Sequence, residues 1–184
     1  FLSPTNGEQF TSGPAGGHNG GMANNTRTLL IVHHSPTDTV RPIARRVIEK
    51  CQEAAAQAAE ALGESAPRIE VVERQALEPD KAELLAADAV IFGTTANFGY
   101  ISGALKHYFD TLFYEVNEEK KGTPVSWWIR GGFDTTGAEK AMDSIITGLQ
   151  WEVAAEPVAF TGNPAEQQDR LDTMAEAMVG ALLS

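Results

Sequence analysis

Residues 35–39, SPTDT, combine hydroxyl groups, a carboxylate and a turn-forming proline between an apolar run and a predicted helix. Ser35, Thr37 and Thr39 supply hydroxyl donors, and the first turn of a helix leaves backbone N–H groups unpaired. Together these groups predict a phosphate cradle that needs no lysine. The pattern is neither a P-loop nor a glycine-rich dinucleotide fingerprint. Taken alone, the same residues are also typical of ordinary helix capping.

Two further segments place glycines directly after a predicted strand. Residues 88–113, DAVIFGTTANFGYISGALKHYFDTLF, hold three glycines and the aromatic pair Phe98 and Tyr100. Residues 129–139, IRGGFDTTGAE, hold a glycine pair and a third glycine near a helix start. Glycines let the backbone approach a planar ligand closely, and aromatic rings can pack against its edge or face. The alternative is a pair of ordinary loops whose aromatics belong to the core.

The histidines, the single cysteine and a possible Ser-His-Asp set give only weak evidence for a metal or catalytic site. His33 and His34 are neighbours at a strand end and point to opposite faces, so they are not expected to form a metal pair. Ser35, His34 and Asp38 could suggest a hydrolase, but the nucleophile elbow G-x-S-x-G is absent. The single cysteine, Cys51, excludes an intrachain disulfide and a multi-cysteine metal site, and we expect it to be buried. We therefore expect neither a metal site nor a catalytic acid or base.

The segments that must position these loops alternate between strand and helix patterns. Short apolar or β-branched runs predict five strands, at residues 28–32, 68–72, 89–92, 124–129 and 152–160. Apolar residues at three- and four-residue spacing predict five helices, at residues 39–62, 79–86, 101–116, 136–149 and 164–183. Parallel neighbours need a crossover helix, so this alternation favours a parallel sheet. Continuously apolar runs such as VSWWI are typical of strands covered on both faces.

The predicted fold class is therefore α/β, a three-layer, doubly wound, five-stranded parallel sheet. In such sheets ligands bind beyond the carboxyl ends of the strands, where the winding reverses. The loops after the first, third and fourth strands meet at that edge. Three loops with residues suited to ligand binding that converge on one crevice favour a binding site more strongly than any one of them does alone.

The amino-acid composition limits the kinds of molecule that the protein is expected to bind. The formal net charge of −11 argues against a nucleic-acid partner, because such binding relies on basic patches. A small anion remains compatible, since backbone N–H groups can hold it. No apolar stretch approaches the roughly 20 residues needed to span a bilayer.

The first residues differ from the rest in composition. Residues 1–21 are rich in Gly, Ser, Thr, Asn and Pro without a period, and we expect them to be a leader, tag or linker. Met22 is the expected native start, and residues 22–184 are expected to form a single domain. Without a signal-peptide pattern or cysteine pairs, a cytoplasmic location is expected.

These motifs resemble the flavodoxin-like FMN-binding family, and most closely its NAD(P)H:quinone oxidoreductases of tryptophan-repressor-binding-protein type. The resemblance depends on VHHSPTDTV, on the segment DAVIFGTTANFGYISGALKHYFDTL and, more weakly, on GGFDTTGAE. It implies a sheet of order 2-1-3-4-5 that binds FMN non-covalently. A short segment before the third strand lacks the insertion of the tetrameric branch, which favours a monomer or dimer.

The resemblance also implies a set of FMN-binding residues. Those around the phosphate are Ser35, Thr37, Asp38, Thr39 and Val40. Those lining the ring system, largely through backbone, are Thr95, Ala96, Asn97, Phe98 and Gly99. Those closing the other side are Ile129, Arg130, Gly131 and Gly132. Trp151 occupies the neighbourhood of a family histidine, and we expect it to be a core residue rather than a ring partner.

The function this implies is an FMN-binding oxidoreductase that passes electrons from NAD(P)H to a quinone or similar small acceptor. The alternative is a flavodoxin-type electron carrier that shuttles electrons between protein partners and has no substrate of its own. We expect the acidic residues Glu115, Glu118 and Glu119 to form a solvated face, and the alternative is that they dock a basic redox partner. A third hypothesis is a flavodoxin-like interaction module that has lost its flavin.

Overall fold

The computed structural model describes residues 25–184. The predicted leader, residues 1–21, and the predicted start at Met22 lie outside the described residues. The strands are β1 (Thr26–His33), β2 (Arg68–Gln75), β3 (Ala89–Asn97), β4 (Tyr100–Ile101), β5 (Pro124–Gly131), β6 (Glu152–Val153) and β7 (Val158–Thr161). The helices are α1 (Arg41–Leu62), α2 (Lys81–Ala86), α3 (Gly103–Val116), α4 (Thr136–Leu149) and α5 (Gln168–Gly180), with short 3₁₀ turns η1 (Gly63–Ser65) and η2 (Pro164–Gln167).

The predicted α/β class with a parallel sheet is confirmed, but the prediction of five strands in the order 2-1-3-4-5 is wrong. Over residues 25–184 the sheet has seven strands in the order β2-β1-β3-β5-β6, with β4 pairing beside β3 and β7 beside β5. Two local events account for the difference. The chain turns back after β3 to add the antiparallel β4, and the predicted strand 152–160 is divided into β6 and β7, which both pair in parallel with β5.

The division of that strand has a visible cause. Residues 154–157 leave the sheet between β6 and β7, and Pro157 has no N–H to donate to a ladder. The hydroxyl of Ser126 donates to the carbonyl of Ala155 at 3.0 Å and holds the bulge against β5. The predicted last helix, residues 164–183, is also shorter, because it opens with the 3₁₀ turn η2 and its α-helical part ends at Gly180.

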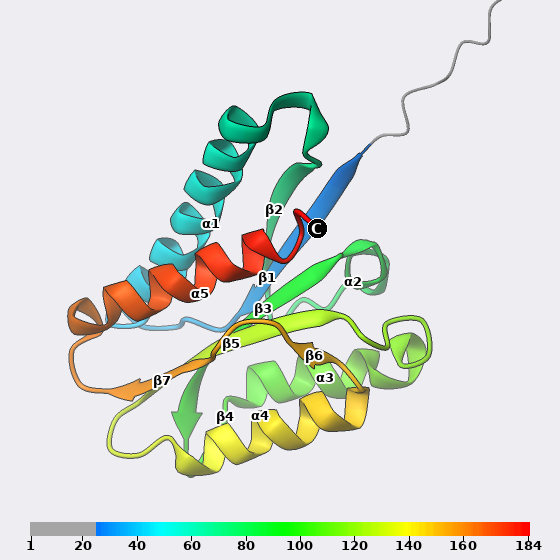
Figure 1. The fold of residues 1–184 in the computed structure, drawn as a ribbon. Helices are drawn as coiled ribbons and strands as arrows, with labels where there is room; N and C mark the ends of the chain where they lie inside the picture. Colours follow the sequence, from blue (N-terminus) through cyan, green and yellow to red (C-terminus); the bar gives the residue numbers. More distant parts are fainter. Residues whose placement is uncertain (1–24) are drawn as a thin grey trace, which may run out of the picture.

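Helices cover both faces of the sheet, so the molecule has three layers (Figure 1). Along β1, Leu29 and Ile31 point to the face covered by α1 and α5, whereas Leu30 and Val32 point to the face covered by α2, α3 and α4. All four side chains are fully buried. This two-sided burial explains why the central strands are continuously apolar. No helix within residues 25–184 is long and apolar enough to cross a membrane.

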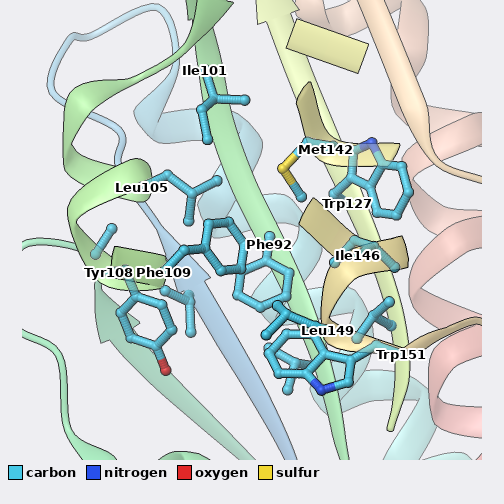
Figure 2. Packing of buried hydrophobic residues seen from close by; sticks show 14 of the residues in the cluster. Phe92, Ile101, Leu105, Tyr108, Phe109, Trp127, Met142, Ile146, Leu149 and Trp151 are labelled. Atoms are coloured by element: carbon cyan, nitrogen blue, oxygen red, sulfur yellow. The ribbon is translucent and has the colours of Figure 1, made fainter. Parts of the chain in front are cut away.

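An aromatic cluster fills the layer under α3 and α4 (Figure 2). The ring of Phe92 on β3 lies 4.9 Å from that of Phe109 on α3 and stacks on Trp151 at 5.8 Å, with planes 5° apart. The expectation that Trp151 is a core residue is confirmed, because its side chain is buried at the opposite end of the sheet from the predicted ligand loops.

The other two tryptophans lie on opposite faces of β5, as neighbours on a strand must. Trp127 packs under α3 and α4, and Trp128 under α1 and α5. The indole of Trp128 lies across Gly93 of β3, where a Cβ would come within 1.9 Å of the ring. Gly93 is therefore required by packing, because any side chain there would occupy the space of the indole.

Helices α1 and α5 are joined by both charge and apolar contacts. The guanidinium of Arg46 on α1 donates to the carboxylate of Asp172 on α5 at 2.7 Å, and this hydrogen bond lowers the pKa of Asp172.

Cys51 lies in the apolar layer between α1 and the sheet, as expected, and burial raises the pKa of its thiol to about 12.

Candidate functional site

The carboxyl ends of β1, β3 and β5 lie side by side and place three loops at one edge of the sheet. His33 at the end of β1 is in register with Gly93 of β3, which is in register with Trp128 of β5. The backbone N–H of His34 then donates to the carbonyl of Gly93 at 3.0 Å, so the first loop departs directly from this row. The predicted convergence of the three loops is thus present in the structure (Figure 1).

The first loop presents unpaired backbone donors at the start of a long helix. The carbonyl of Thr37 accepts from the N–H groups of Val40 and Arg41 at 3.2 and 3.0 Å, which forms the turn into α1. Within residues 25–184, the N–H groups of Thr37, Asp38 and Thr39 donate to no protein acceptor, and all three residues are exposed. No side chain in the described part of the chain caps the helix. Several free donors at the positive end of a 22-residue helix form a site for an anion.

Arg41 stabilises this loop, and the sequence analysis did not select it. Its guanidinium donates to the carbonyl of Pro36 at 2.8 Å and pairs with the carboxylate of Asp38. The pair compensates a negative charge that would otherwise repel an anion held by the neighbouring N–H groups. The only sequence signal for this contact was the three-residue spacing of the two charges on a helix start.

Beneath the loop, the buried imidazole of His33 makes two polar contacts. Its Nδ1 lies 2.9 Å from Oγ of Ser35, and its Nε2 lies 2.8 Å from a carboxylate oxygen of Glu73 on β2. The Trp128 ring lies 6.0 Å from the imidazole. Partial burial, together with the charge of neighbouring His33, lowers the pKa of His34. The contact between His33 and Glu73 cannot be predicted from the sequence, because it depends on the pairing of β1 with β2.

The second loop is a tight turn rather than an open loop. β3 continues through Thr95, Ala96 and Asn97, which the sequence analysis placed in a loop, because β4 pairs back onto it. The turn consists of Phe98 at φ 50° and Gly99 at φ 75°. Positive φ is uncommon for a side-chain-bearing residue, and it directs the Phe98 ring into solvent, where it is fully exposed.

Hydrogen bonds fix this turn to the helix that follows. The N–H of Ser102 donates to the hydroxyl oxygen of Thr94 at 3.0 Å, and the hydroxyl oxygen of Ser102 accepts from the N–H of Leu105 at 3.2 Å. Ser102 is therefore the N-cap of α3. Because both hydroxyls are buried and hydrogen-bonded, they fix the base of the second loop to the start of α3.

The third loop carries a second fully exposed ring, that of Phe133. The carboxylate of Asp134 accepts from the hydroxyl of Thr136 at 2.8 Å and from its N–H at 3.2 Å, and these bonds lower the pKa of Asp134. A Cβ on Gly137, in the first turn of α4, would come within 1.9 Å of the carbonyl oxygen of Gly99. The second and third loops are therefore in direct contact, and each presents one exposed phenylalanine.

The remaining predicted residues divide between the edge and the core. Thr95 pairs in register with Arg130, and Ala96 with Gly131, so these four residues are brought together at the edge. The guanidinium of Arg130 donates to the carbonyl of Gly162 at 3.3 Å.

Val40 and Ile129 lie differently. Their side chains are buried in the two apolar layers, so only their backbone can contribute to a ligand site. Gly132 is exposed between β5 and Phe133.

These groups fit a planar aromatic molecule that carries a phosphate. The free N–H groups before α1 suit the phosphate, and the exposed rings of Phe98 and Phe133 suit a planar partner. The Nε of Arg130 is buried without a partner among the described residues, which leaves a donor beside the crevice. Phe133 was missed by the sequence analysis, although its place directly after a glycine pair was a usable signal.

The fold is that of flavodoxin-like proteins. A short-chain flavodoxin associated with a bacterial microcompartment superposes with a TM-score of 0.66 at 18% identity, covering 85% of this chain and 99% of its own. An oxidoreductase from Corynebacterium diphtheriae gives a TM-score of 0.61 at 20% identity, covering 86% of this chain and 97% of its own. A WrbA-like flavodoxin from Agrobacterium tumefaciens gives 0.61 at 13% identity, covering 85% and 96%. No family model matches the chain, and no curated protein is significantly similar to it in sequence.

Proposed function

We propose that the protein binds FMN at the carboxyl edge of its sheet and acts as an oxidoreductase that uses NAD(P)H and a quinone or similar small acceptor. The observation that carries the proposal is the combination, at one edge, of free helix N-terminal donors with two fully exposed phenylalanines on touching loops. The fold shared with flavodoxins, an oxidoreductase and a WrbA-like protein supports the same assignment.

The residues have separate parts in this proposal. The segment Ser35–Thr39, with the backbone of Val40, holds the phosphate. The segment Thr95–Gly99 holds one side of the ring system, and the segment Arg130–Gly132, with the backbone of Ile129, holds the other. Bound FMN supplies the electron transfer between NAD(P)H and the acceptor. The protein supplies binding and orientation, and none of these side chains is placed as a catalytic acid or base.

The second candidate is an electron carrier between proteins. It is favoured by the formal net charge of −11, since an acidic surface attracts basic redox partners. The exposed phenylalanines are compatible with it, because they leave the site open to a docking surface.

One titration separates these functions. The protein is mixed with FMN, freed of unbound flavin and treated anaerobically with NADH or NADPH while the visible spectrum is recorded. Bleaching within seconds, reversed by a quinone, is the expected result for the oxidoreductase. A bound flavin that bleaches only after a separate reductase protein is added supports the carrier. Absence of bound flavin contradicts both functions.

A further inference from the structure

His33 connects the proposed phosphate loop to the edge strand of the sheet. It is buried at the end of β1, with Ser35 on one ring nitrogen at 2.9 Å and Glu73 on the other at 2.8 Å. The side chain of Ser35 thus has a partner before any ligand binds. This contact limits what the Ser35 hydroxyl can offer to a phosphate.

The imidazole borders a groove of about 620 Å³ between α1 and β2. Several charged or titratable groups line this groove or adjoin the imidazole: Glu73 from β2, Arg41, Arg45 and Glu49 from α1, and His34, the next residue in the sequence. The neighbouring strands β3 and β5 present Gly93 and Trp128, which carry no charge. Arg41 is paired with Asp38 in the loop, and among the described residues Glu73 is the one acid of this group within hydrogen-bonding distance of the imidazole.

The hydrogen-bonding rules of these groups fix the direction of each bond. An ionised carboxylate only accepts, so the Nε2 of His33 carries a proton and donates to Glu73. In a neutral imidazole the other nitrogen then has no proton, and Nδ1 accepts from the hydroxyl of Ser35. The single hydroxyl proton of Ser35 is consumed by this bond, and only oxygen lone pairs face the loop.

When His33 takes up a second proton, the direction reverses. Nδ1 then donates to Oγ of Ser35, and the hydroxyl proton is released to donate to an anion in the loop. The added positive charge beside the loop favours the same anion. The protonation state of His33 thus decides whether Ser35 presents oxygen lone pairs or a hydroxyl proton to the loop.

We propose that His33 is a positioning residue that couples capture of the FMN phosphate to uptake of a proton, acting through Ser35 and kept in one tautomer by Glu73. This inference rests on the proposed function, because it needs the phosphate to lie at the first loop. It predicts that the preference for FMN over riboflavin, which lacks the phosphate, decreases as the pH rises.

The test compares FMN and riboflavin binding by the whole 184-residue chain between pH 6 and 8. Dissociation constants come from quenching of flavin fluorescence. The FMN preference of the wild-type protein is expected to fall by roughly tenfold over this range, the lower end of what a hydrogen bond to a charged group contributes. Calorimetry in two buffers of different ionisation enthalpy is expected to show proton uptake with FMN that is absent with riboflavin.

Glu73→Gln is the decisive variant. Its amide can donate to Nε2, so a neutral imidazole can carry its proton on Nδ1 and release Ser35 without taking up another. We expect this variant to keep FMN binding at pH 8 and to lose the part of the pH dependence and of the proton uptake that comes from His33, which leaves only the contribution of the FMN phosphate itself. Glu73 is half exposed, so the exchange is not expected to unfold the protein.

Glu70→Gln is the matched control. Glu70 is exposed on the same strand, and its exchange removes the same charge, but its side chain points to the opposite face. This variant should behave like the wild type. The phosphate of FMN itself titrates near pH 6, but it contributes equally to all three proteins.

The outcomes separate the two proposals. A wild-type protein that binds neither flavin contradicts the proposed function. FMN binding with equal proton uptake and equal pH dependence in the wild type and in Glu73→Gln overturns the role of His33 and leaves the proposed function standing.

Discussion

The contact between α4 and the Phe98–Gly99 turn makes a quantitative prediction. In the variant Gly137→Ala, the new methyl group would lie 1.9 Å from the carbonyl oxygen of Gly99 and 2.8 Å from its carbonyl carbon. Non-bonded heavy atoms settle about 3.5–4.0 Å apart, so helix and turn must separate by about 1.5 Å or more. The turn cannot adapt easily, because Gly99 already has φ 75°.

The expected cost follows from this overlap. Overpacking of a close contact destabilises a fold by about 1–3 kcal/mol. For a domain of this size each kcal/mol lowers Tm by about 2–4 °C, so Gly137→Ala should melt roughly 2–12 °C below the wild type. If the proposed function is correct, displacement of the turn should also weaken FMN binding.

The same helix contains its own control. Gly148 lies on α4, and a methyl group placed there would meet no atom of residues 25–184 within 4 Å beyond its own stretch of helix backbone, so Gly148→Ala gains helix propensity without a clash. That gain is about 0.5–1 kcal/mol, which raises Tm by roughly 1–4 °C. Thermal unfolding followed by circular dichroism at 222 nm compares the three proteins. If Gly137→Ala melts at or above Gly148→Ala, the steric argument is refuted.

Three other perturbations test other parts of the molecule. In the wild-type background, Gly93→Ala should lower the free energy of unfolding by about 1–3 kcal/mol, as measured in urea. In a Trp128→Leu background the same exchange should lower it much less, and equal losses in both would show that the indole is not the obstacle. Asp172→Asn should lower the free energy of unfolding at neutral pH, because the ion pair with Arg46 stabilises only the ionised carboxylate, whose pKa is depressed in the folded protein. The difference from the wild type should disappear as the pH falls well below 3.8, and a constant difference across an acid titration would contradict this. Phe98→Ala and Phe133→Ala should each weaken FMN binding by roughly threefold to tenfold with Tm unchanged, since both rings are solvent-exposed; unchanged flavin affinity would exclude them as ring partners.

The sequence predicted the elements better than their connections at the sheet edge. The apolar runs of the central strands located β1, β3 and β5, because strands buried on both faces leave a continuous pattern. It could not locate β4, since two residues pairing with the end of β3 have no periodicity of their own. It could not divide β6 from β7 either, because the interruption depends on which residues find partners on β5.

The candidate site shows the same division between local and long-range information. The hydroxyl-rich first loop could be predicted, since it depends on neighbouring residues. The Phe98–Gly99 turn could not, because it forms where β4 pairs back onto the end of β3. The contact of His33 with Glu73 could not, because it joins residues 40 positions apart through the pairing of two strands. The exposed position of Phe133 likewise depends on how the third loop packs against the second.

The lone thiol in the layer between α1 and the sheet offers a kinetic measure of how that layer opens. A thiol reacts as its thiolate, and Cys51 is both fully buried and, with a pKa of about 12, protonated in the folded protein. An alkylating reagent can reach it only when α1 separates from its neighbours. The labelling rate therefore reports the free energy of that opening without any introduced probe.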